Sequence, residues 1–488
     1  MVDVASYDKL YIGGEWVQPR STNVFEVISP TSGQLLASAP EGLEADMDAA
    51  IAAARDAFDN GPWPQMSAGE RADAMQRLLD LINANANELA ELITAEIGSP
   101  ILFSHFGQVG AASMVLDYYV NLTRTFEFES VRPGMLGPVL VRKEGVGVCA
   151  GIIPWNVPLF IIMLKLAPAL ASGSTIVLKP APESPLSGMY LAKLIDEAGF
   201  PPGVVNIVPA GREAGEHLVT APGVDKVSFT GSTAAGKKIG ALCGERLRRC
   251  TLELGGKSAA ILLDDVDIAA TVPALLPYGI MNNGQACVAQ TRILAPRSRY
   301  DEVVDAFTEA MGNLKTGDPA EMDTDIGPLI AERQRDRVES YIAKGLAEGA
   351  RITVGGGRPE GLDGWFVEPT LFVDVDNSMT IAQEEIFGPV LAVIPYDDVD
   401  DAVAIANDSD FGLSGSVWTT DVDAGVDIAR RVRTGTYTVN GFAMEWGAPF
   451  GGYKNSGVGR ELGPEGLSAY LEDKSINLPA GFEPTLKN

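Results

Sequence analysis

The spacing of apolar and polar positions divides the chain into segments of different character. Apolar residues recur every three or four positions in 44–58, 68–97 and 108–124, which predicts three amphipathic helices. Residues 9–26 contain short apolar runs instead, the pattern of short strands. From residue 145 onwards, apolar runs of strand length alternate with helical patterns about every 20–25 residues. This alternation predicts right-handed crossovers, a parallel sheet and hence an α/β fold.

The boundaries of these elements follow from turn residues and from the change of period. Strands are expected at 146–153, 174–178, 204–208, 224–229, 251–254 and 259–263, and helices at 186–198, 213–220, 232–246 and 268–282. A domain boundary is expected near 255–256, where two glycines separate consecutive strands.

Two further segments have their own pattern. Residues 126–142 predict a strand–turn–strand hairpin that projects outward to pair with another subunit, and 474–478 predict a strand in the tail. Residues 145–164 contain no charged residue and have about the length of a membrane span. Pro154 and Pro158 interrupt this run, so it is interpreted as a buried strand, a turn and the start of a buried helix.

Composition and charge restrict the possible partners. The chain has 488 residues, of which 46% are hydrophobic, so it is long and apolar enough for several globular domains. A net charge of −28 repels phosphate backbones and argues against nucleic acid as a partner. A phosphate-bearing ligand must therefore be held by backbone amides and a few placed cations.

The cysteines and histidines restrict both the compartment and the chemistry. Four cysteines, none in a C-x-x-C pair, predict a reduced cytoplasmic compartment, and the first residues show no signal-peptide pattern. His105 and His217 both lie in expected helices away from any motif. A Ser-His-Asp or Cys-His device is therefore not supported, and a nucleophilic cysteine would need a carboxylate base.

The stretch 229–238 is typical of a phosphate site, because a glycine turn there leads from a strand into a helix. Gly231, Gly236 and Lys237 match the P-loop pattern, but Lys238 replaces the Ser or Thr that would hold Mg²⁺. A dinucleotide diphosphate, which needs no metal, fits better than a P-loop nucleotide hydrolase, which remains an alternative. The remaining interpretation is an ordinary helix N-cap by Ser232 or Thr233.

Three single residues lie where α/β proteins place ligand contacts. Asn156 follows Pro154 in a rigid turn and offers an amide donor for an oxyanion, or it merely caps the turn. Lys179 closes an expected strand and could bond a ribose or a phosphate, or it is a solvated loop lysine. Glu253 ends an apolar strand, where burial would raise its pKa and make it a base near neutrality.

Cys287 is the candidate nucleophile. It follows an expected helix and lies in a glycine- and amide-rich stretch, 279–290, at the possible mouth of a pocket. The alternative is a small buried thiol that packs as a hydrophobe. The expected boundary near 255–256 would place Glu253 and Cys287 on opposite sides of a cleft between two lobes.

Taken together, the motifs resemble the aldehyde dehydrogenase superfamily over about residues 9–478. In order, these motifs are Pro154-Trp-Asn156, Gly231-Ser-Thr-x-x-Gly236, Leu252-Glu-Leu-Gly-Gly-Lys257, Gly284-Gln-x-Cys287, Glu385-Ile-Phe387-Gly-Pro and Pro449-Phe-Gly-Gly-Tyr-Lys454. The resemblance implies a Rossmann-type dinucleotide-binding domain (1–125 and 144–255) and an α/β catalytic domain (256–455). It also implies a β-strand oligomerisation arm (126–143 and 469–488) and a homo-oligomer, either a dimer or a homotetramer.

The resemblance also implies a mechanism. Cys287 would attack the aldehyde carbon, and Asn156 with the backbone N–H of Cys287 would stabilise the oxyanion. Hydride transfer to the nicotinamide would leave a thioester, and Glu253 would activate the water that hydrolyses it to a carboxylic acid. Lys165 matches a further active-site lysine, and some activation of the Cys287 thiol is expected. A non-catalytic member of the fold could lose these residues, yet Cys287, Glu253 and Asn156 are all present.

For the cofactor, the resemblance assigns ribose contacts to Lys179 and Glu385, a diphosphate contact to Ser232, and a surrounding surface to Trp155 and Phe387. The full expected cofactor set is Trp155, Lys179, Glu183, Gly231, Ser232, Gly236, Leu254, Glu385 and Phe387, and no metal is implied. Many NAD-preferring members carry an acid where this chain has Pro182, and Glu183 follows one position later. NAD is nevertheless expected over NADP, because no further cation is expected beside Lys179 to receive a 2′-phosphate.

The resemblance places a substrate tunnel along apolar side chains. The expected lining residues are Val157, Ile161, Leu164, Met281, Met444 and Phe450. No arginine is matched there to bind a carboxylate. The expected substrate is therefore an uncharged, aliphatic or terpenoid-like aldehyde.

Overall fold

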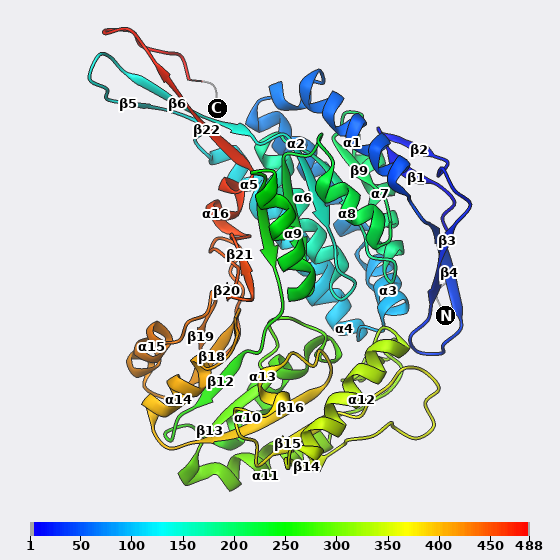
Figure 1. The fold of residues 1–488 in the computed structure, drawn as a ribbon, viewed down its shortest axis with the longest axis vertical. Helices are drawn as coiled ribbons and strands as arrows, with labels where there is room; N and C mark the ends of the chain where they lie inside the picture. Colours follow the sequence, from blue (N-terminus) through cyan, green and yellow to red (C-terminus); the bar gives the residue numbers. More distant parts are fainter. Residues whose placement is uncertain (1–3, 487–488) are drawn as a thin grey trace.

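The computed structural model describes residues 4–486 and contains two large sheets and a projecting arm (Figure 1). The first sheet has the strand order β2-β1-β9-β8-β7-β10-β11-β21. Its strands are β2 (Glu15–Val17), β1 (Leu10–Ile12), β9 (Val205–Ile207), β8 (Thr175–Lys179), β7 (Val148–Ile152), β10 (Lys226–Thr230), β11 (Arg249–Glu253) and β21 (Gly457–Val458). The run from β9 to β11 is parallel, as the alternation of strands and helices predicts.

Helices cover both faces of the first sheet. The apolar cluster on one face includes α1 (Glu44–Asp59), α8 (Arg212–Thr220) and α9 (Thr233–Glu245). The cluster on the other face includes α2 (Ala68–Ala84), α3 (Ala86–Ile97), α5 (Ala111–Thr125), α6 (Pro158–Ser172) and α7 (Pro185–Ala198). The short helices η1 (Trp63–Gln65), α4 (Ile101–Phe103) and η2 (Ser104–Gly110) connect them, and β3 (Val24–Ile28) pairs with β4 (Leu35–Pro40).

The second sheet has the order β14-β15-β16-β13-β12-β18-β19 and lies below the first in Figure 1. Its strands are β14 (Arg351–Val354), β15 (Thr370–Val373), β16 (Val390–Tyr396), β13 (Arg292–Pro296), β12 (Ala259–Leu262), β18 (Gly415–Trp418) and β19 (Thr438–Val439). Helices α10 (Ile268–Ile280) and α11 (Tyr300–Gly312) cover one face, while α12 (Glu332–Ala347), α13 (Thr380–Gln383), α14 (Val399–Asn407) and α15 (Val422–Arg431) pack on the other. The elements η3 (Met281–Gly284), η4 (Arg297–Arg299), β17 (Phe411–Gly412) and β20 (Tyr453–Lys454) are short.

The arm is an antiparallel sheet of three strands in the order β22-β6-β5. The expected hairpin forms from β5 (Glu129–Arg132) and β6 (Val139–Gly145). After α16 (Gly463–Ser468), the tail strand β22 (Leu471–Asn477) pairs with β6 along its whole length. The arm extends away from the rest of the molecule at the upper left of Figure 1.

Three expected boundaries were wrong, each for a local reason. The helix expected at 68–97 breaks at Asn85, whose side chain donates to the Leu81 carbonyl at 2.8 Å and ends α2. The helix expected at 108–124 is preceded by a π-helical segment, η2. The helix expected at 268–282 ends at Ile280, because Asn282 and Asn283 adopt left-handed φ angles of 52° and 61°. Asparagine tolerates this conformation better than most residues.

The uncharged run 145–164 folds as expected. It contains β7, a turn through Pro154 and the buried first half of α6. Within residues 4–486, none of the helices is both long and apolar enough to span a membrane. The assignment of separate roles to the parts of the chain stays a prediction.

Candidate active site

The carboxyl ends of four parallel strands bring distant residues to one edge of the first sheet. The register pairs Ile152 with Lys179 and with Phe229, and Thr230 with Glu253. The turn that carries Asn156 leaves the end of β7 at the same edge. Because all parallel strands point the same way, their terminal side chains meet here.

Three neighbouring cavities lie along this edge. The outer cavity, of about 370 Å³, lies between α8 and α9 and is lined by Lys179, Arg212, Lys238 and Ser232 among others. The middle cavity, of about 280 Å³, includes Ser232, Trp155, Glu385, Phe387 and Cys287. The apolar cavity, of about 450 Å³, shares Asn156, Thr230 and Cys287 with the middle one. Ser232 therefore links the first two cavities, and Cys287 lies where the second meets the third.

A network of amide side chains holds the Cys287 loop. Asn283 donates from Nδ2 to the carbonyls of Gly98 (2.8 Å) and Pro328 (2.9 Å), and its Oδ1 accepts from the Gly327 N–H. Gln285 Oε1 accepts from the Ile330 N–H at 3.1 Å. These bonds compensate for the left-handed backbone at 282–284 and fix the approach to Cys287.

Asn156 is buried against the same loop. Its Nδ2 donates to the Gln285 carbonyl at 2.9 Å, and its own carbonyl accepts from Asn282 Nδ2 at 2.8 Å. The amide nitrogen has two hydrogens, so one remains for an oxygen at the junction of the two cavities. The backbone N–H groups of Cys287 and Val288 point towards the Cys287 sulfur. The structure thus brings together the expected oxyanion donors.

Glu253 lies buried in the wall of the apolar cavity beside a second acid, Glu461. Among the described residues, neither Glu253 oxygen has a partner in regular hydrogen-bond geometry, although the Gly452 N–H is close enough to lower its pKa slightly. Burial first, and the charge of Glu461 second, raise the pKa of Glu253 well above its usual value. Glu253 is therefore a protonatable group whose charge is costly in this resting site.

Lys165 is fully buried beneath this carboxyl pair. Its Nζ donates to Glu461 Oε1 at 2.8 Å and to Thr230 Oγ1 at 2.7 Å. Lys165 does not line any of the three cavities, so the structure places it behind the cavity wall. Its positive charge also lowers the pKa of Glu253, which opposes the effect of Glu461.

The expected activation of the Cys287 thiol is not present in this structure. Burial, together with the nearby charges of Glu385 and Glu253, raises the pKa of Cys287 to about 12. The backbone N–H groups at Cys287 and Val288 act in the opposite direction but do not prevail. At neutral pH the resting side chain is a thiol, and attack requires loss of its proton to a neighbouring group.

The middle cavity has a polar and aromatic wall. Trp155 and Phe387 lie edge to face with ring centroids 5.3 Å apart. Phe387 has a left-handed φ of 64°, and its carbonyl accepts from Gln334 Nε2 at 2.7 Å. Glu385 accepts from the Gly256 N–H at 2.9 Å, and burial raises its pKa to about 7. The segment 385–387 is thus held in place by α12.

The outer cavity contains more cations than the sequence predicts. Lys179 donates to the carbonyls of Pro180 and Ala210, and Arg212 and Lys238 line the same cavity. The statement that no further cation lies beside Lys179 was therefore wrong, because α8 and α9 supply two. Lys238 is paired with Glu216 at 2.5 Å, and Glu216 also lines the cavity.

The structure does not bring Glu183 to any of the three cavities. Its carboxylate forms an ion pair with Arg333 of α12. The other expected cofactor residues lie along the path: Gly231 and Leu254 line the middle cavity, and Ser232 caps α9 by accepting from the Ala235 N–H at 3.3 Å. Gly236 is buried against Leu254, where a Cβ would lie 2.3 Å from a methyl carbon. Its role is therefore close helix–strand packing.

The apolar cavity contains all the expected tunnel residues, namely Val157, Ile161, Leu164, Met281, Met444 and Phe450. Sequence reasoning missed most of the aromatic residues beside them: Phe103, Phe106, Phe160, Tyr278, Phe442 and Trp446. These come from several distant elements, including η2, so no local pattern marks them. It also missed Glu461, for which the signal was an isolated acid within the glycine-rich stretch 447–463.

Comparison with known proteins agrees with this fold and site. The model of the aldehyde dehydrogenase family matches residues 16–476. Geranial dehydrogenase of Castellaniella defragrans is 46% identical over 473 residues, which cover 97% of this chain and 99% of that protein. An aldehyde dehydrogenase of Mycobacterium tuberculosis complexed with NAD⁺ has a TM-score of 0.97 and 51% identity, covering 99% and 100% of the two chains.

A second solved structure is aldehyde dehydrogenase C of Pseudomonas syringae complexed with NAD⁺ and octanal. It has a TM-score of 0.94 and 41% identity, and covers 98% of this chain and 97% of its own. The present chain belongs to the aldehyde dehydrogenase family. The expected family and fold are confirmed, and nothing in these comparisons supports a P-loop nucleotide hydrolase.

Proposed function

We propose that this protein oxidises uncharged, apolar aldehydes to carboxylic acids with NAD, through a thioester on Cys287. The observation that carries the proposal is the position of Cys287 at the junction of two unlike cavities. A nucleophile there faces a polar cavity on one side and an apolar cavity on the other. Geranial and octanal, named for two of the relatives, are both uncharged and apolar aldehydes.

The residues present fit a dinucleotide. The 13-residue helix α9 begins where the outer and middle cavities meet, so its N-terminal amides suit a diphosphate. The Trp155 and Phe387 rings and Glu385 line the middle cavity next to Cys287. When bound, NAD supplies the acceptor for the hydride that leaves the substrate carbon.

The chain's own residues then perform the remaining steps. Cys287 Sγ loses its proton and bonds to the aldehyde carbon, while Asn156 Nδ2 and backbone N–H groups bind the resulting oxyanion. Oxidation leaves a thioester on Cys287. Glu253 removes a proton from a water molecule, the hydroxide adds to the thioester carbonyl, and the acid leaves as the thiol is restored.

The buried pair of acids supports a proton-holding role for Glu253. Its raised pKa means that it holds a proton more readily than an exposed glutamate does. Lys165 anchors Glu461, and Glu461 Oε2 has no hydrogen-bond partner among residues 4–486. Proton gain at Glu253 removes its repulsion with Glu461, so uptake of the water proton is favoured at that stage.

The decisive experiment measures reduced-nicotinamide absorbance and acid formation with octanal and NAD. Stoichiometric formation of octanoic acid and reduced nicotinamide is the expected result. A parallel series with succinic semialdehyde, which carries a carboxylate, should show much lower kcat/KM, because no Lys or Arg lines the apolar cavity among the described residues. Equal activity with both substrates, or no reduction with either, contradicts the proposal.

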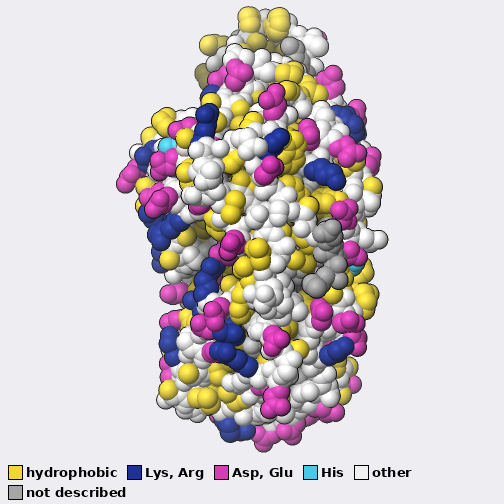
Figure 2. Space-filling view, turned by 90° about the vertical axis from the view of Figure 1, so that its right-hand side faces the viewer, with side chains coloured by type: hydrophobic (Ala, Val, Ile, Leu, Met, Phe, Trp, Pro, Cys, Tyr) yellow, Lys and Arg dark blue, Asp and Glu magenta, His cyan; other side chains and the backbone are white. Residues whose placement is uncertain are grey.

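We further propose that the protein assembles as a homo-oligomer through the arm. Hydrophobic side chains gather at the end of the arm, at the top of Figure 2, and Met135 and Leu136 are 101% and 89% exposed. On β22 and β5, Ile476 and Val131 are also exposed. Apolar groups in such positions favour contact with another protein surface.

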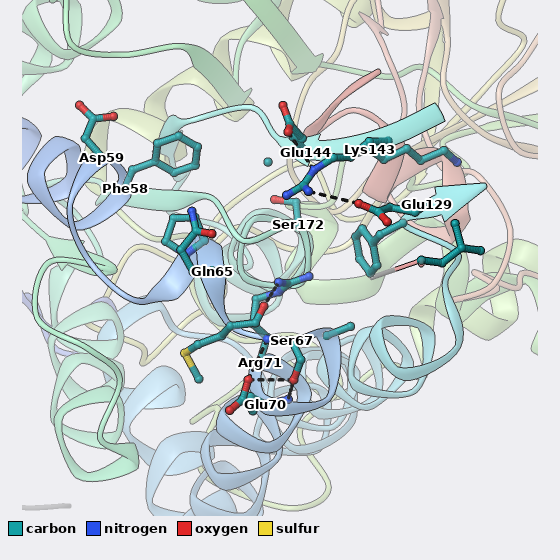
Figure 3. Close-up of a pocket in the computed structure, with 17 residues that line it drawn as sticks. Phe58, Asp59, Gln65, Ser67, Glu70, Arg71, Glu129, Lys143, Glu144 and Ser172 are labelled. Atoms are coloured by element: carbon teal, nitrogen blue, oxygen red, sulfur yellow. Dashed lines mark hydrogen bonds and ion pairs between the residues drawn. The ribbon is translucent and has the colours of Figure 1, made fainter. Parts of the chain in front are cut away.

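A cavity of about 820 Å³ at the base of the arm supports this proposal (Figure 3). It lies between α2 and the β5–β6 hairpin and contains Arg71, Glu70 and the ion pair of Arg142 with Glu129. Light scattering should give a dimer or tetramer, and Ile476→Glu should shift it towards the monomer. A monomeric wild-type protein contradicts the assembly but leaves the chemistry intact. A cytoplasmic location remains a prediction from cysteine usage.

A further inference from the structure

Helix α9 packs on β11 so that two cysteines, neither of which lines any of the three cavities, lie against each other. A Cβ at Gly236 would lie 2.3 Å from Leu254 Cδ2, and a Cβ at Gly240 would lie 3.3 Å from Leu252 Cδ1. Moving one turn along the helix corresponds to about two residues back along the antiparallel strand, since both span about 5–7 Å. The next helix position on this face is Cys243, and the next strand position is Cys250.

The turn between α9 and β11 brings the end of the helix next to the start of the strand. The Arg248 N–H donates to the Cys243 carbonyl at 2.9 Å, and exposed Leu247 adopts a left-handed φ of 53°. The Arg248 guanidinium donates to the carbonyls of Val219 and Ala221 at the end of α8. As a result, the Cys243 and Cys250 side chains belong to the same apolar cluster, and each thiol shifts the pKa of the other.

The two thiols differ in exposure and in charge environment. Cys243 is buried, whereas Cys250 is partly exposed. The hydrogen bond from Cys243, assisted by the charge of Lys226, lowers the pKa of Cys250 to about 7 and raises that of Cys243. Burial raises the pKa of Cys287 and of Cys149 to about 12. Cys250 is therefore the thiol of the four that most readily reacts as thiolate.

We propose that Cys243 and Cys250 are a redox pair that forms a reversible disulfide when a hydroperoxide oxidises the protein. The Cys250 thiolate attacks one peroxide oxygen, giving a sulfenic acid and releasing an alcohol, or water when the oxidant is hydrogen peroxide. Cys243 then attacks the sulfenic sulfur, and water leaves as the S–S bond forms. Each cysteine is oxidised by one electron, and the peroxide O–O bond accepts both electrons.

The disulfide should alter the outer cavity, a consequence that rests on the proposed use of NAD. Helix α9 contributes Ala235, Lys238, Ile239 and Leu242 to the cavity wall, and Leu242 directly precedes Cys243. An S–S bond of about 2.05 Å is shorter than a thiol contact, so it draws this end of α9 towards β11. We expect the KM for NAD to rise by about fivefold or more, with a smaller change in kcat.

The chemical step is tested by mass spectrometry without any activity measurement. The protein is treated with hydrogen peroxide, blocked with iodoacetamide and digested with trypsin. Cleavage after Lys238, Arg246, Arg249 and Lys257 yields peptides 239–246 and 250–257, each with one cysteine. We expect these two peptides linked, with loss of two hydrogens and recovery by dithiothreitol. A Cys287 peptide that oxidises while 239–246 and 250–257 remain unlinked would overturn the proposal.

Matched variants separate this pair from the other thiols. Cys250→Ser removes the attacking thiol and should abolish the linked peptide, whereas Cys149→Ser, at a buried thiol outside the pair, should leave it unchanged. Cys243→Ser should leave a sulfenic acid on Cys250, detectable with dimedone. Circular dichroism of each reduced variant checks folding. A folded Cys149→Ser protein that gives no linked peptide would also overturn the pairing.

The kinetic consequence is read by comparing wild type with Cys250→Ser after the same peroxide treatment. Loss of activity common to both proteins reports damage to Cys287, while a KM shift confined to wild type reports the disulfide. A linked peptide with an unchanged KM for NAD overturns the coupling to the outer cavity. Absence of NAD reduction in untreated, reduced protein would contradict the proposed function. The linked-peptide measurement would still test the disulfide, because it does not depend on activity.

Discussion

The middle and apolar cavities share Cys287 but differ in nearly everything else. The middle cavity carries Arg333, Arg337 and Glu385 on its wall, and these charges come from α12 and from the segment it holds. Among the described residues of the apolar cavity, the acids are Glu253, which is near Cys287, and Glu461, which is near Glu253, and no lysine or arginine lines the cavity. One side therefore suits a charged dinucleotide and the other an apolar chain that ends in a carbonyl.

In contrast, the acid–base state of the site has the same cause on both sides of Cys287, namely burial. Burial raises the pKa of Glu385 to about 7 on the middle side and that of Glu253 well above 4.5 on the apolar side. It also lowers the pKa of buried Lys257 to about 7. Charge is costly on both sides of Cys287, so each catalytic proton transfer starts from groups close to neutral.

Removing the shared nucleophile should have the largest effect. Cys287→Ala should lower kcat with octanal and NAD by about 10⁴-fold or more, because no thioester can form. Reduced-nicotinamide absorbance measures the rate. Cys149→Ala is the matched control, since Cys149 is buried in β7 away from all three cavities. An active Cys287→Ala enzyme would contradict the mechanism.

Glu253→Gln should separate the two half-reactions. We expect steady-state turnover to fall by about 10²–10⁴-fold while a pre-steady-state burst of reduced nicotinamide remains, because oxidation precedes the hydrolysis that needs a base. In wild type, hydrolysis should rise with pH through a pKa well above 4.5, since the active form of Glu253 is the deprotonated one.

Stopped-flow absorbance measures the burst, and steady-state rates across pH measure the profile. Both the burst and turnover should persist in wild type, and the pH dependence should disappear in Glu253→Gln. Loss of the burst itself would assign Glu253 to the first half-reaction instead.

A positive charge placed in the apolar cavity should reduce the difference in charge between the apolar and the middle cavity. Met281→Arg should lower kcat/KM for octanal by about 10–200-fold, because an apolar chain would have to desolvate a guanidinium. The same variant should lose less with propanal and gain relative activity with succinic semialdehyde. Met281→Leu, similar in volume, is the control, and an equal loss with all aldehydes would place the damage outside substrate binding.

The smallest expected effect concerns the cations of the outer cavity. Arg212→Ala and Lys238→Ala should each lower kcat/KM for NADP by about two- to fivefold, because exposed charge pairs contribute little. Activity with NAD should change less. Lys237→Ala is the matched control, since Lys237 is adjacent in sequence but does not line the cavity. Equal losses with both cofactors would mean that these cations do not contact a 2′-phosphate.

Much of the architecture could be predicted from local pattern. The alternation after residue 145 predicts a parallel sheet, although not its strand order, and the two segments outside it form β5, β6 and β22 of the arm. The errors fall where side chains override periodicity. The Asn85 side chain divides one expected helix because it donates to the Leu81 carbonyl of that helix. Asn282 and Asn283 end another helix because both adopt a left-handed conformation.

The residues of the site divide in the same way. Cys287, Asn156 and Glu253 lie in short motifs with one unusual side chain in a constrained turn or strand end, so their chemistry can be inferred without coordinates. The sequence alone therefore determined which residues are the candidates for nucleophile, amide donor and base, and these roles stay predictions. It also determined the α/β class, because hydrophobic period depends only on neighbours along the chain.

Tertiary structure decided what surrounds these groups. Glu461 approaches Glu253 from 208 residues further along the chain, and Arg212 and Lys238 meet Lys179 from two different helices. The high pKa of Cys287 likewise depends on burial and on Glu385, which belong to other elements. Such properties arise from the desolvation and charge of spatial neighbours, and no local sequence pattern records which distant residues those neighbours are.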